Sequence, residues 1–149
     1  MTQVKKYDIF DVCLQAKTKK PFDTPLKAHF TAPDGTRITV WGFYDGDDRF
    51  IIRFMPEQEG IYTYETVSPL PELHGATGSF RCSGADGHGK VMPDGLYLKH
   101  ADGARHYSVG TTSYAWIYQP ESIRKDTLSE LKKGYFNKIR MCVFPKWYL

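Results

Sequence analysis

Short runs in which apolar and polar residues alternate, separated by turn residues roughly every 8 to 12 positions, dominate the first half of this 149-residue sequence. In residues 26–31, for example, the apolar residues Leu26, Ala28 and Phe30 occupy every second position. Successive side chains of a strand point to opposite faces, so this pattern is typical of a strand with one buried face. About seven such runs over residues 7–81 predict a β-sandwich.

The same alternation predicts the core face of two other strands. Their inward-facing residues are expected to be Phe10, Val12, Leu14 and Ala16 in one strand and Phe50, Ile52 and Phe54 in the other. Residues 37–44 are predicted to form a single strand between two turns. The spacing Gly60-x-Tyr62-x-Tyr64 resembles the tyrosine corner of immunoglobulin-like domains. We therefore expect an immunoglobulin-like β-sandwich over residues 1–83.

The second half of the sequence differs in composition and pattern. Residues 84–95 are rich in glycine and predict an interdomain linker. Residues 96–149 then contain a hairpin, one helix between Pro120 and Gly134, and a strand over residues 136–144. The apolar residues of the helix are expected to form a buried stripe made of Ile123, Leu128 and Leu131. Strand, helix and strand with short connections predict a βαβ unit with parallel strands.

Charge and hydropathy exclude several classes of partner. A net charge of +3, from 20 basic and 17 acidic residues, is too small and too dispersed to predict a nucleic-acid partner. The sequence contains no run of about 18 apolar residues, so no membrane span is expected. The first ten residues are charged and contain no apolar stretch, so no secretory signal is expected. The chain as given is therefore expected in the cytoplasm, and export of a longer form is left open.

The sequence predicts neither a metal site nor a cofactor. Cys13, Cys82 and Cys142 have no CxxC spacing and form an odd set, which favours reduced thiols over disulfides or zinc ligands. The acidic residues at 45–48 lack the ligand order of a calcium-binding loop and predict a turn. The five histidines show no HxH or HExxH spacing.

Four segments of the chain carry a resemblance to a known family. They are residues 42–46 (GFYDG), 59–65 (EGIYTYE), 110–116 (GTTSYAW) and 136–146 (FNKIRMCVFPK). Together they resemble the N-terminal immunoglobulin-like domain of bacterial glycoside hydrolases, followed by the first strand, first helix and second strand of the apiosidase-like (β/α)8 barrel. The resemblance implies a mainly β chain that ends in one βαβ unit of a truncated barrel.

The same resemblance implies a parent enzyme that hydrolyses complex polysaccharide with two carboxylates, and therefore carbohydrate as its partner. In the glycosidases with that barrel, these carboxylates follow the fourth and seventh strands. A complete barrel needs about 250 residues, so this chain is expected to stop after the second strand. We accordingly expect the fragment to lack the catalytic carboxylates and to be inactive alone.

The resemblance also supplies candidate site residues. Arg140 resembles the arginine that braces the nucleophilic carboxylate; the alternative is an arginine that packs by its stem and pairs with any acidic neighbour. A barrel places its substrate loops at the strand ends. The candidate substrate-binding residues there are Tyr114, Trp116, Phe144, Lys146 and Trp147. Their aromatic rings could stack on sugar, or pack against the sandwich or another copy of the chain.

A second function class remains open from the sequence. The chain could be a non-catalytic module that binds carbohydrate or a protein partner, with Trp41, Phe43 and Tyr44 as a platform, although such a run more often fills a core or a domain interface. In either case, a βαβ unit without the rest of its sheet exposes strand edges and an apolar helix face. We therefore expect residues 96–149 to self-associate or to be disordered.

Overall fold

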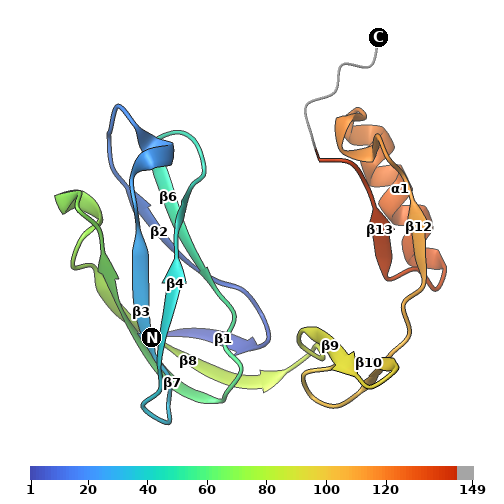
Figure 1. The fold of residues 1–149 in the computed structure, drawn as a ribbon, viewed down its shortest axis with the longest axis horizontal. Coiled ribbons are helices and arrows are strands. Elements are labelled where there is room, and N and C mark those ends of the chain that lie inside the picture. Colours follow the sequence, from blue (N-terminus) through green and yellow to red (C-terminus); the bar gives the residue numbers. More distant parts are fainter. Residues whose placement is uncertain (144–149) are drawn as a thin grey trace. The chain divides into compact units, whose positions relative to one another are not determined.

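The computed structural model describes residues 1–143 and confirms a mainly β chain (Figure 1). It divides into two compact units, one spanning Met1–Ala104 and one that begins at Arg105. The first unit is a β-sandwich, as the strand pattern predicted. The second contains the one α-helix of the described residues.

Two sheets form the sandwich. The larger sheet has five strands in the order β1 (Thr2–Lys6), β8 (Thr77–Ala85), β7 (Gly60–Val67), β3 (Lys27–Thr31) and β4 (Arg37–Trp41). The smaller sheet has three strands in the order β2 (Phe10–Gln15), β6 (Arg49–Phe54) and β5 (Phe43–Tyr44). All neighbours pair antiparallel except β1 and β8, which pair in parallel. Strand β1 was not expected from the sequence.

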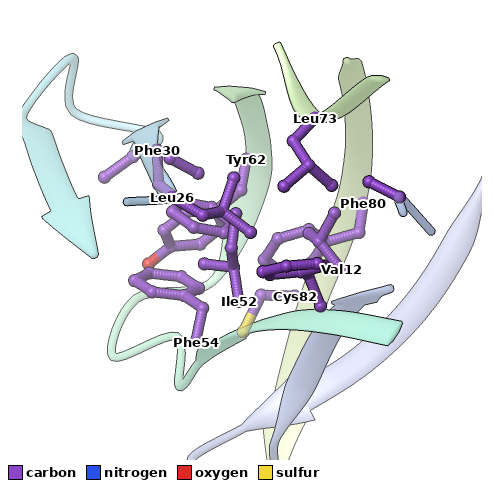
Figure 2. Close-up of a cluster of buried hydrophobic side chains, with 13 residues drawn as sticks. Val12, Leu26, Phe30, Ile52, Phe54, Tyr62, Leu73, Phe80 and Cys82 are labelled. Carbon is purple, nitrogen blue, oxygen red and sulfur yellow. The ribbon is translucent and has the colours of Figure 1, made fainter. Parts of the chain in front are cut away.

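Aromatic side chains from both sheets meet in the core (Figure 2). Phe30 of the larger sheet stacks on Phe54 of the smaller one with ring centroids 4.2 Å apart. Tyr62 stacks on Phe80 within the larger sheet, at 5.1 Å. The predicted inward faces are confirmed, since every residue named for them is buried or lies partly buried against the cluster. Burial of this apolar surface is the main force that holds the two sheets together.

The predicted strand over residues 37–44 is wrong, because the chain crosses from one sheet to the other at Gly42. β4 ends at Trp41 in the larger sheet and β5 begins at Phe43 in the smaller one. The Gly42 amide donates a hydrogen bond to the Leu26 carbonyl at 2.8 Å. A Cβ atom at this position would lie 2.8 Å from Leu26 Cδ2, so the close approach requires glycine.

Short elements complete the first unit. The two 3₁₀ helices are η1 (Pro21–Asp23) and η2 (Pro71–Leu73), and Leu73 is fully buried in the core. β9 (Val91–Asp94) pairs antiparallel with β10 (Tyr97–His100). Part of the segment predicted as a linker over residues 84–95 therefore forms a strand.

The second unit contains a βαβ arrangement, as predicted. After β11 (Arg105–His106), its elements are β12 (Gly110–Thr112), η3 (Trp116–Tyr118), α1 (Glu121–Lys133) and β13 (Lys138–Arg140). β12 and β13 pair in parallel, and the helix lies between them in the chain. The helix follows Pro120 and ends at Lys133, and the amide of the next residue, Gly134, donates a hydrogen bond to the Leu131 carbonyl at 3.2 Å.

The prediction of a buried stripe on this helix is wrong. No residue of α1 is buried, and Ile123 and Leu128 are 47% and 38% exposed. Leu128 and Leu131 line a hollow of about 230 Å³ together with Ile139 of β13. Two short strands offer too little surface to cover the apolar face of a 13-residue helix, so its leucines are half exposed.

Candidate functional site

The carboxyl ends of β12 and β13 lie side by side. The parallel register pairs Thr112 with Arg140 at these ends. Pairing continues beyond the strands, because the Ser113 amide donates to the Arg140 carbonyl at 2.9 Å and the Cys142 amide donates to the Tyr114 carbonyl at 3.0 Å. These bonds hold the backbone of two predicted site residues, Tyr114 and Arg140, in fixed register.

The side chains of Arg140 and Tyr114 also meet. The guanidinium carbon of Arg140 lies 5.7 Å from the centroid of the Tyr114 ring, within cation–π range. Arg140 is exposed and Tyr114 is 52% exposed, so both present polar groups to solvent. Within residues 1–143, no acidic side chain forms an ion pair with Arg140. The guanidinium of Arg140 therefore contacts an aromatic ring and, among the described residues, no carboxylate.

Trp116, another predicted site residue, follows these ends in η3. Its indole Nε1 donates a hydrogen bond to the backbone carbonyl of Arg124 in α1, at 3.3 Å, and the residue is half-buried. The ring is thus tied to the helix, with part of its surface accessible. The remaining predicted residues, Phe144, Lys146 and Trp147, lie outside the described residues.

Asn137 has a role that the sequence reasoning missed. Its side-chain Oδ1 accepts a hydrogen bond from the Val109 amide at 2.9 Å, and its Nδ2 donates to the Tyr107 carbonyl at 2.7 Å. Its own amide donates to the Val109 carbonyl at 2.9 Å. Asn137 therefore links the segment before β12 to the start of β13, at the end of the strand opposite Arg140. The sequence shows only an amide side chain just before a strand, which does not identify the segment that it binds.

Two acidic side chains of α1 form ion pairs along the helix. Glu121 pairs with Lys125 at 2.7 Å and Glu130 with Lys133 at 2.5 Å. Asp126 also lies on α1 and not at a strand end. Neither residues 113–116 nor residues 141–143 include an Asp or Glu. Glycoside hydrolysis requires two carboxyl groups about 5 to 9.5 Å apart. Residues 112–116 and 140–143 therefore offer a cation and aromatic rings, but no such acid pair.

One acidic residue in the first unit has a histidine partner. His88 Nδ1 and an Asp102 carboxylate oxygen lie 2.6 Å apart, and the Ala104 amide donates to the other oxygen at 2.9 Å. The hydrogen bond with His88 and the backbone bond lower the pKa of Asp102. These contacts close the turn after β10.

The aromatic run at residues 41–44 does not fill the core as a unit. Trp41 is 66% exposed on β4 and Phe43 is 41% exposed on β5. Tyr44 is half-buried, with its ring 5.2 Å from that of Phe50. Because the chain changes sheets at Gly42, Trp41 and Phe43 belong to different sheets.

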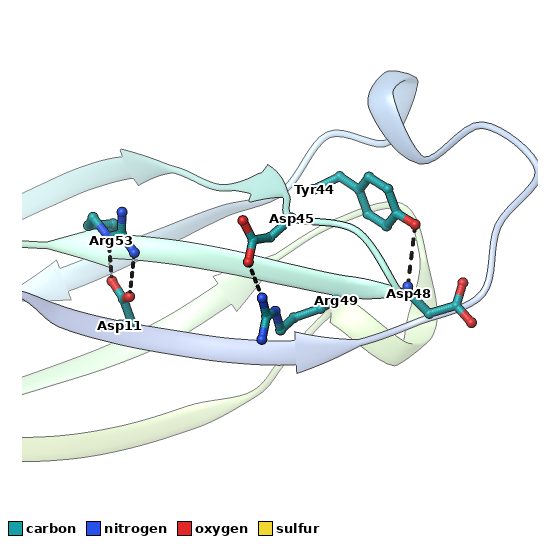
Figure 3. A network of polar contacts seen from close by, with 6 residues as sticks. All are labelled: Asp11, Tyr44, Asp45, Asp48, Arg49 and Arg53. Atoms are coloured by element: carbon teal, nitrogen blue, oxygen red, sulfur yellow. Dashed lines mark hydrogen bonds and ion pairs between the residues drawn. The ribbon is translucent and has the colours of Figure 1, made fainter. Parts of the chain in front are cut away.

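Polar contacts on the smaller sheet surround the predicted turn at residues 45–48 (Figure 3). The Tyr44 hydroxyl accepts a hydrogen bond from the Asp48 amide at 3.3 Å, and Asp45 forms an ion pair with Arg49. Further along the sheet, Arg53 donates to both oxygens of Asp11, at 2.9 and 2.7 Å. The hydrogen bonds from Arg53 lower the pKa of Asp11.

Among residues 1–143, no three His, Cys, Asp or Glu side chains are grouped so that they could hold a metal ion. In the same part of the chain, no helix is both long and apolar enough to span a membrane.

Comparison with known proteins begins with the sandwich. Residues 3–69 match the family model described as Domain of unknown function (DUF5060). No curated protein matches the chain.

Solved structures extend the similarity into the second unit. The crystal structure of a "putative glycoside hydrolase" from Bacteroides vulgatus ATCC 8482 is 41% identical to this chain, with a TM-score of 0.88. The match covers 99% of this chain and 30% of that protein, so the chain spans less than a third of its relative. The Lin-41 filamin domain is 15% identical, with a TM-score of 0.44, over 55% of this chain and 83% of that domain.

The resemblance to glycoside hydrolases is thereby confirmed in its general form. The chain is similar over nearly its whole length to one protein described in those words. Neither the family model nor the Bacteroides structure is described as apiosidase-like or as a (β/α)8 barrel.

Proposed function

We propose that this chain is the N-terminal portion of a glycoside hydrolase that acts on complex polysaccharide. In this proposal the β-sandwich is an accessory domain, and β12, α1 and β13 open an apiosidase-like (β/α)8 barrel. The observation that carries it is the 41% identity, over 99% of this chain, to the Bacteroides protein described as a glycoside hydrolase.

The βαβ arrangement supports a larger parallel sheet. Sheets in which all strands are parallel occur almost only with helices on both faces, because the crossovers place helices there. Here two parallel strands of three residues each carry one helix with a half-exposed apolar face. Additional strands and helices would cover Ile123 and Leu128 and pair the open edges of β12 and β13.

In such a barrel the carboxyl ends of the strands face the substrate. Arg140 would then donate charge-assisted hydrogen bonds to a catalytic carboxylate contributed by a later strand. The rings of Tyr114 and Trp116 would flank the sugar, together with the predicted residues Phe144, Lys146 and Trp147. The Tyr114 ring beside the guanidinium supports this role, because it positions Arg140 without consuming its hydrogen-bond donors on an acid.

The experiment that tests the proposal is to determine the reading frame that follows codon 149 in the source genome. We expect the frame to continue through six more strand and helix repeats, with acidic residues directly after the fourth and seventh strands. A stop codon at that point, or a continuation without repeated strand and helix patterns, would overturn the barrel and favour a stand-alone β-sandwich module.

A further inference from the structure

The outer face of the larger sheet carries polar groups in a regular array. The inward residues of β3 and β7, such as Phe30 and Tyr62, are buried, so the alternate residues point outward. We use the name outer face for nine of these outward residues, which lie around two hollows on β3, β4, β7 and β8: Lys27, His29, Thr31, Arg37, Thr39, Trp41, Thr63, Glu65 and Thr77. Further outward residues of β7 and β8, Ile61 and Arg81 among them, follow along the same side of the sheet. The strand pairing places Thr39 beside His29, His29 beside Glu65, and Glu65 beside Thr77.

Two hollows lie on this face. One of about 560 Å³ is lined by His29, Arg37, Glu65 and the threonines of β3, β7 and β8, together with Tyr64 and Gly78. The other, of about 320 Å³, is lined by Lys27, Trp41 and Val67 with the neighbouring prolines. Since Lys27 and His29 follow one another on the outward side of β3, the two hollows adjoin. They form one surface that can take an extended ligand.

Trp41 provides an aromatic ring at one end of this surface. It is 66% exposed, which is unusual for tryptophan, and Lys27 Nζ lies 5.8 Å from its ring centroid. Arg37 stands four residues away on the same edge strand, roughly 14 Å along β4 at about 3.4 Å per residue. A ligand that reaches from the ring to the guanidinium must therefore be longer than a single sugar.

The charge of the outer face is positive. Lys27 and Arg37 contribute two positive charges against one negative charge from Glu65. Among the described residues, Arg37 forms no ion pair. The pKa of His29 is lowered by desolvation, then by the positive charges of Arg37 and Lys27, with Glu65 acting in the opposite direction. His29 is thus expected to be neutral at pH 7, with Nδ1 held by the Thr39 hydroxyl at 2.9 Å.

We propose that the outer face binds an oligosaccharide that carries carboxylate groups, a ligand of the uronic-acid class. Trp41 stacks on one sugar ring, and Arg37 and Lys27 pair with the carboxylates. The threonine hydroxyls and His29 supply hydrogen bonds to sugar hydroxyls. This binding site goes beyond the proposed hydrolase function and lies in a different unit from Arg140.

The composition of the outer face favours a sugar over a protein partner. The centre of a protein interface is depleted in charged residues and enriched in aromatic and other apolar side chains. Here Trp41 is the exposed aromatic residue, at one end, and the middle is lined mainly by threonines, His29 and Glu65, with half-buried Tyr64 and Gly78 beneath them. Many hydroxyl groups beside a single ring match the alternating polar and apolar surfaces of a sugar chain.

The test uses isothermal titration of the 149-residue chain with trigalacturonate and triglucuronate, and with their methyl esters. We expect at least one carboxylated trisaccharide to bind, about tenfold or more tightly than its ester, and more weakly as salt is added. Trp41→Ala and Arg37→Gln should each weaken binding about tenfold, as losing one stacked ring or one charged contact predicts. Phe22→Ala and Lys19→Gln serve as controls, because both residues are exposed outside this face.

Three results would overturn the proposal. Neither carboxylated trisaccharide binds at millimolar concentration; or the esters bind equally well; or Trp41→Ala and Arg37→Gln bind like the unchanged chain. Loss of a dimer in Trp41→Ala, seen by sedimentation, would instead assign the face to a second copy. These results are independent of the hydrolase proposal, which is tested by the reading frame after residue 149.

Discussion

The hydroxyl oxygen of Tyr62 accepts a hydrogen bond from the backbone amide of Gln58, four residues earlier, at 3.0 Å. Tyr62 is 1% exposed, and burial raises the pKa of its hydroxyl. The bond fixes the turn that leads into β7 against the core. This is the tyrosine corner that the spacing of residues 60–64 resembles, so that part of the sequence interpretation is confirmed.

Tyr62→Phe should destabilise the sandwich by about 1 to 2 kcal/mol, because it leaves the Gln58 amide without its acceptor. The measurement is hydrogen exchange of the slowest amides in β3 and β7, which reports unfolding of the first unit alone. Tyr64→Phe is the matched control on the same strand. Within the described residues its hydroxyl has no hydrogen bond, so a change below about 0.5 kcal/mol is expected. Equal effects of the two substitutions would contradict this role of Tyr62.

The ion pair between Asp11 and Arg53 should make the stability of the sandwich depend on pH. The pKa of Asp11 is lower in the folded protein than its ordinary value of about 3.9, so the pair stabilises the fold above that value. This contribution is lost as pH falls through the lower pKa of the folded state. Because Arg53 is 51% exposed, solvent screens the pair and the effect should be small.

Comparison with Asp11→Asn isolates this contribution. The difference in unfolding free energy between the two proteins should be largest above pH 5 and should shrink toward pH 2, as measured by urea denaturation across this range. A difference that stays constant over that range would contradict the assignment.

Asn137→Ala should weaken the attachment of residues 107–109 to the start of β13. Removing the side chain breaks its bonds to the Val109 amide and the Tyr107 carbonyl. We expect the Val109 amide to exchange about tenfold faster, the change that one hydrogen bond predicts. Asn137→Asp keeps an acceptor for Val109 and should preserve much of its protection. If Val109 exchanges equally in all three proteins, Asn137 does not hold this segment.

The second unit should self-associate or unfold when the chain is studied alone. Ile123 and Leu128 are half exposed on α1, and the outer edges of β12 and β13 have no partner strand among residues 1–143. Sedimentation should show a mass that rises with concentration, and Leu128→Lys should reduce it. Phe22→Lys, an exposed position in the first unit, should not. A monodisperse monomer whose residues 105–143 all resist hydrogen exchange would contradict this expectation.

Much of the sandwich could be predicted because burial on one face imposes a period of two. The positions of Val12, Phe30 and Ile52 follow directly from that period. β1 could not be predicted in this way, because its residues are exposed or half-buried and carry little alternation. The crossing at Gly42 could not be predicted either, because it depends on the close approach of Gly42 to Leu26, which lies in a different segment of the chain.

The second unit was predictable in topology and less so in packing. The helix stops before Gly134, as the sequence indicates, but Leu128, which the sequence pattern places in a buried stripe, is 38% exposed. The meeting of Arg140 and Tyr114 follows from parallel pairing, which brings strand ends to one edge. The role of Asn137 rests on the exact offset between two segments, and no local pattern encodes that offset.

Polysaccharide hydrolysis measured side by side tests the central claim most directly. The 149-residue chain and the product of the full reading frame should be compared for release of reducing sugar from a panel of plant polysaccharides. We predict release by the longer protein and none by the 149 residues, which place no acid pair at the ends of β12 and β13 within the described residues. The account would be contradicted if the 149-residue chain hydrolysed a polysaccharide and if Glu121→Gln or Asp102→Asn abolished that activity.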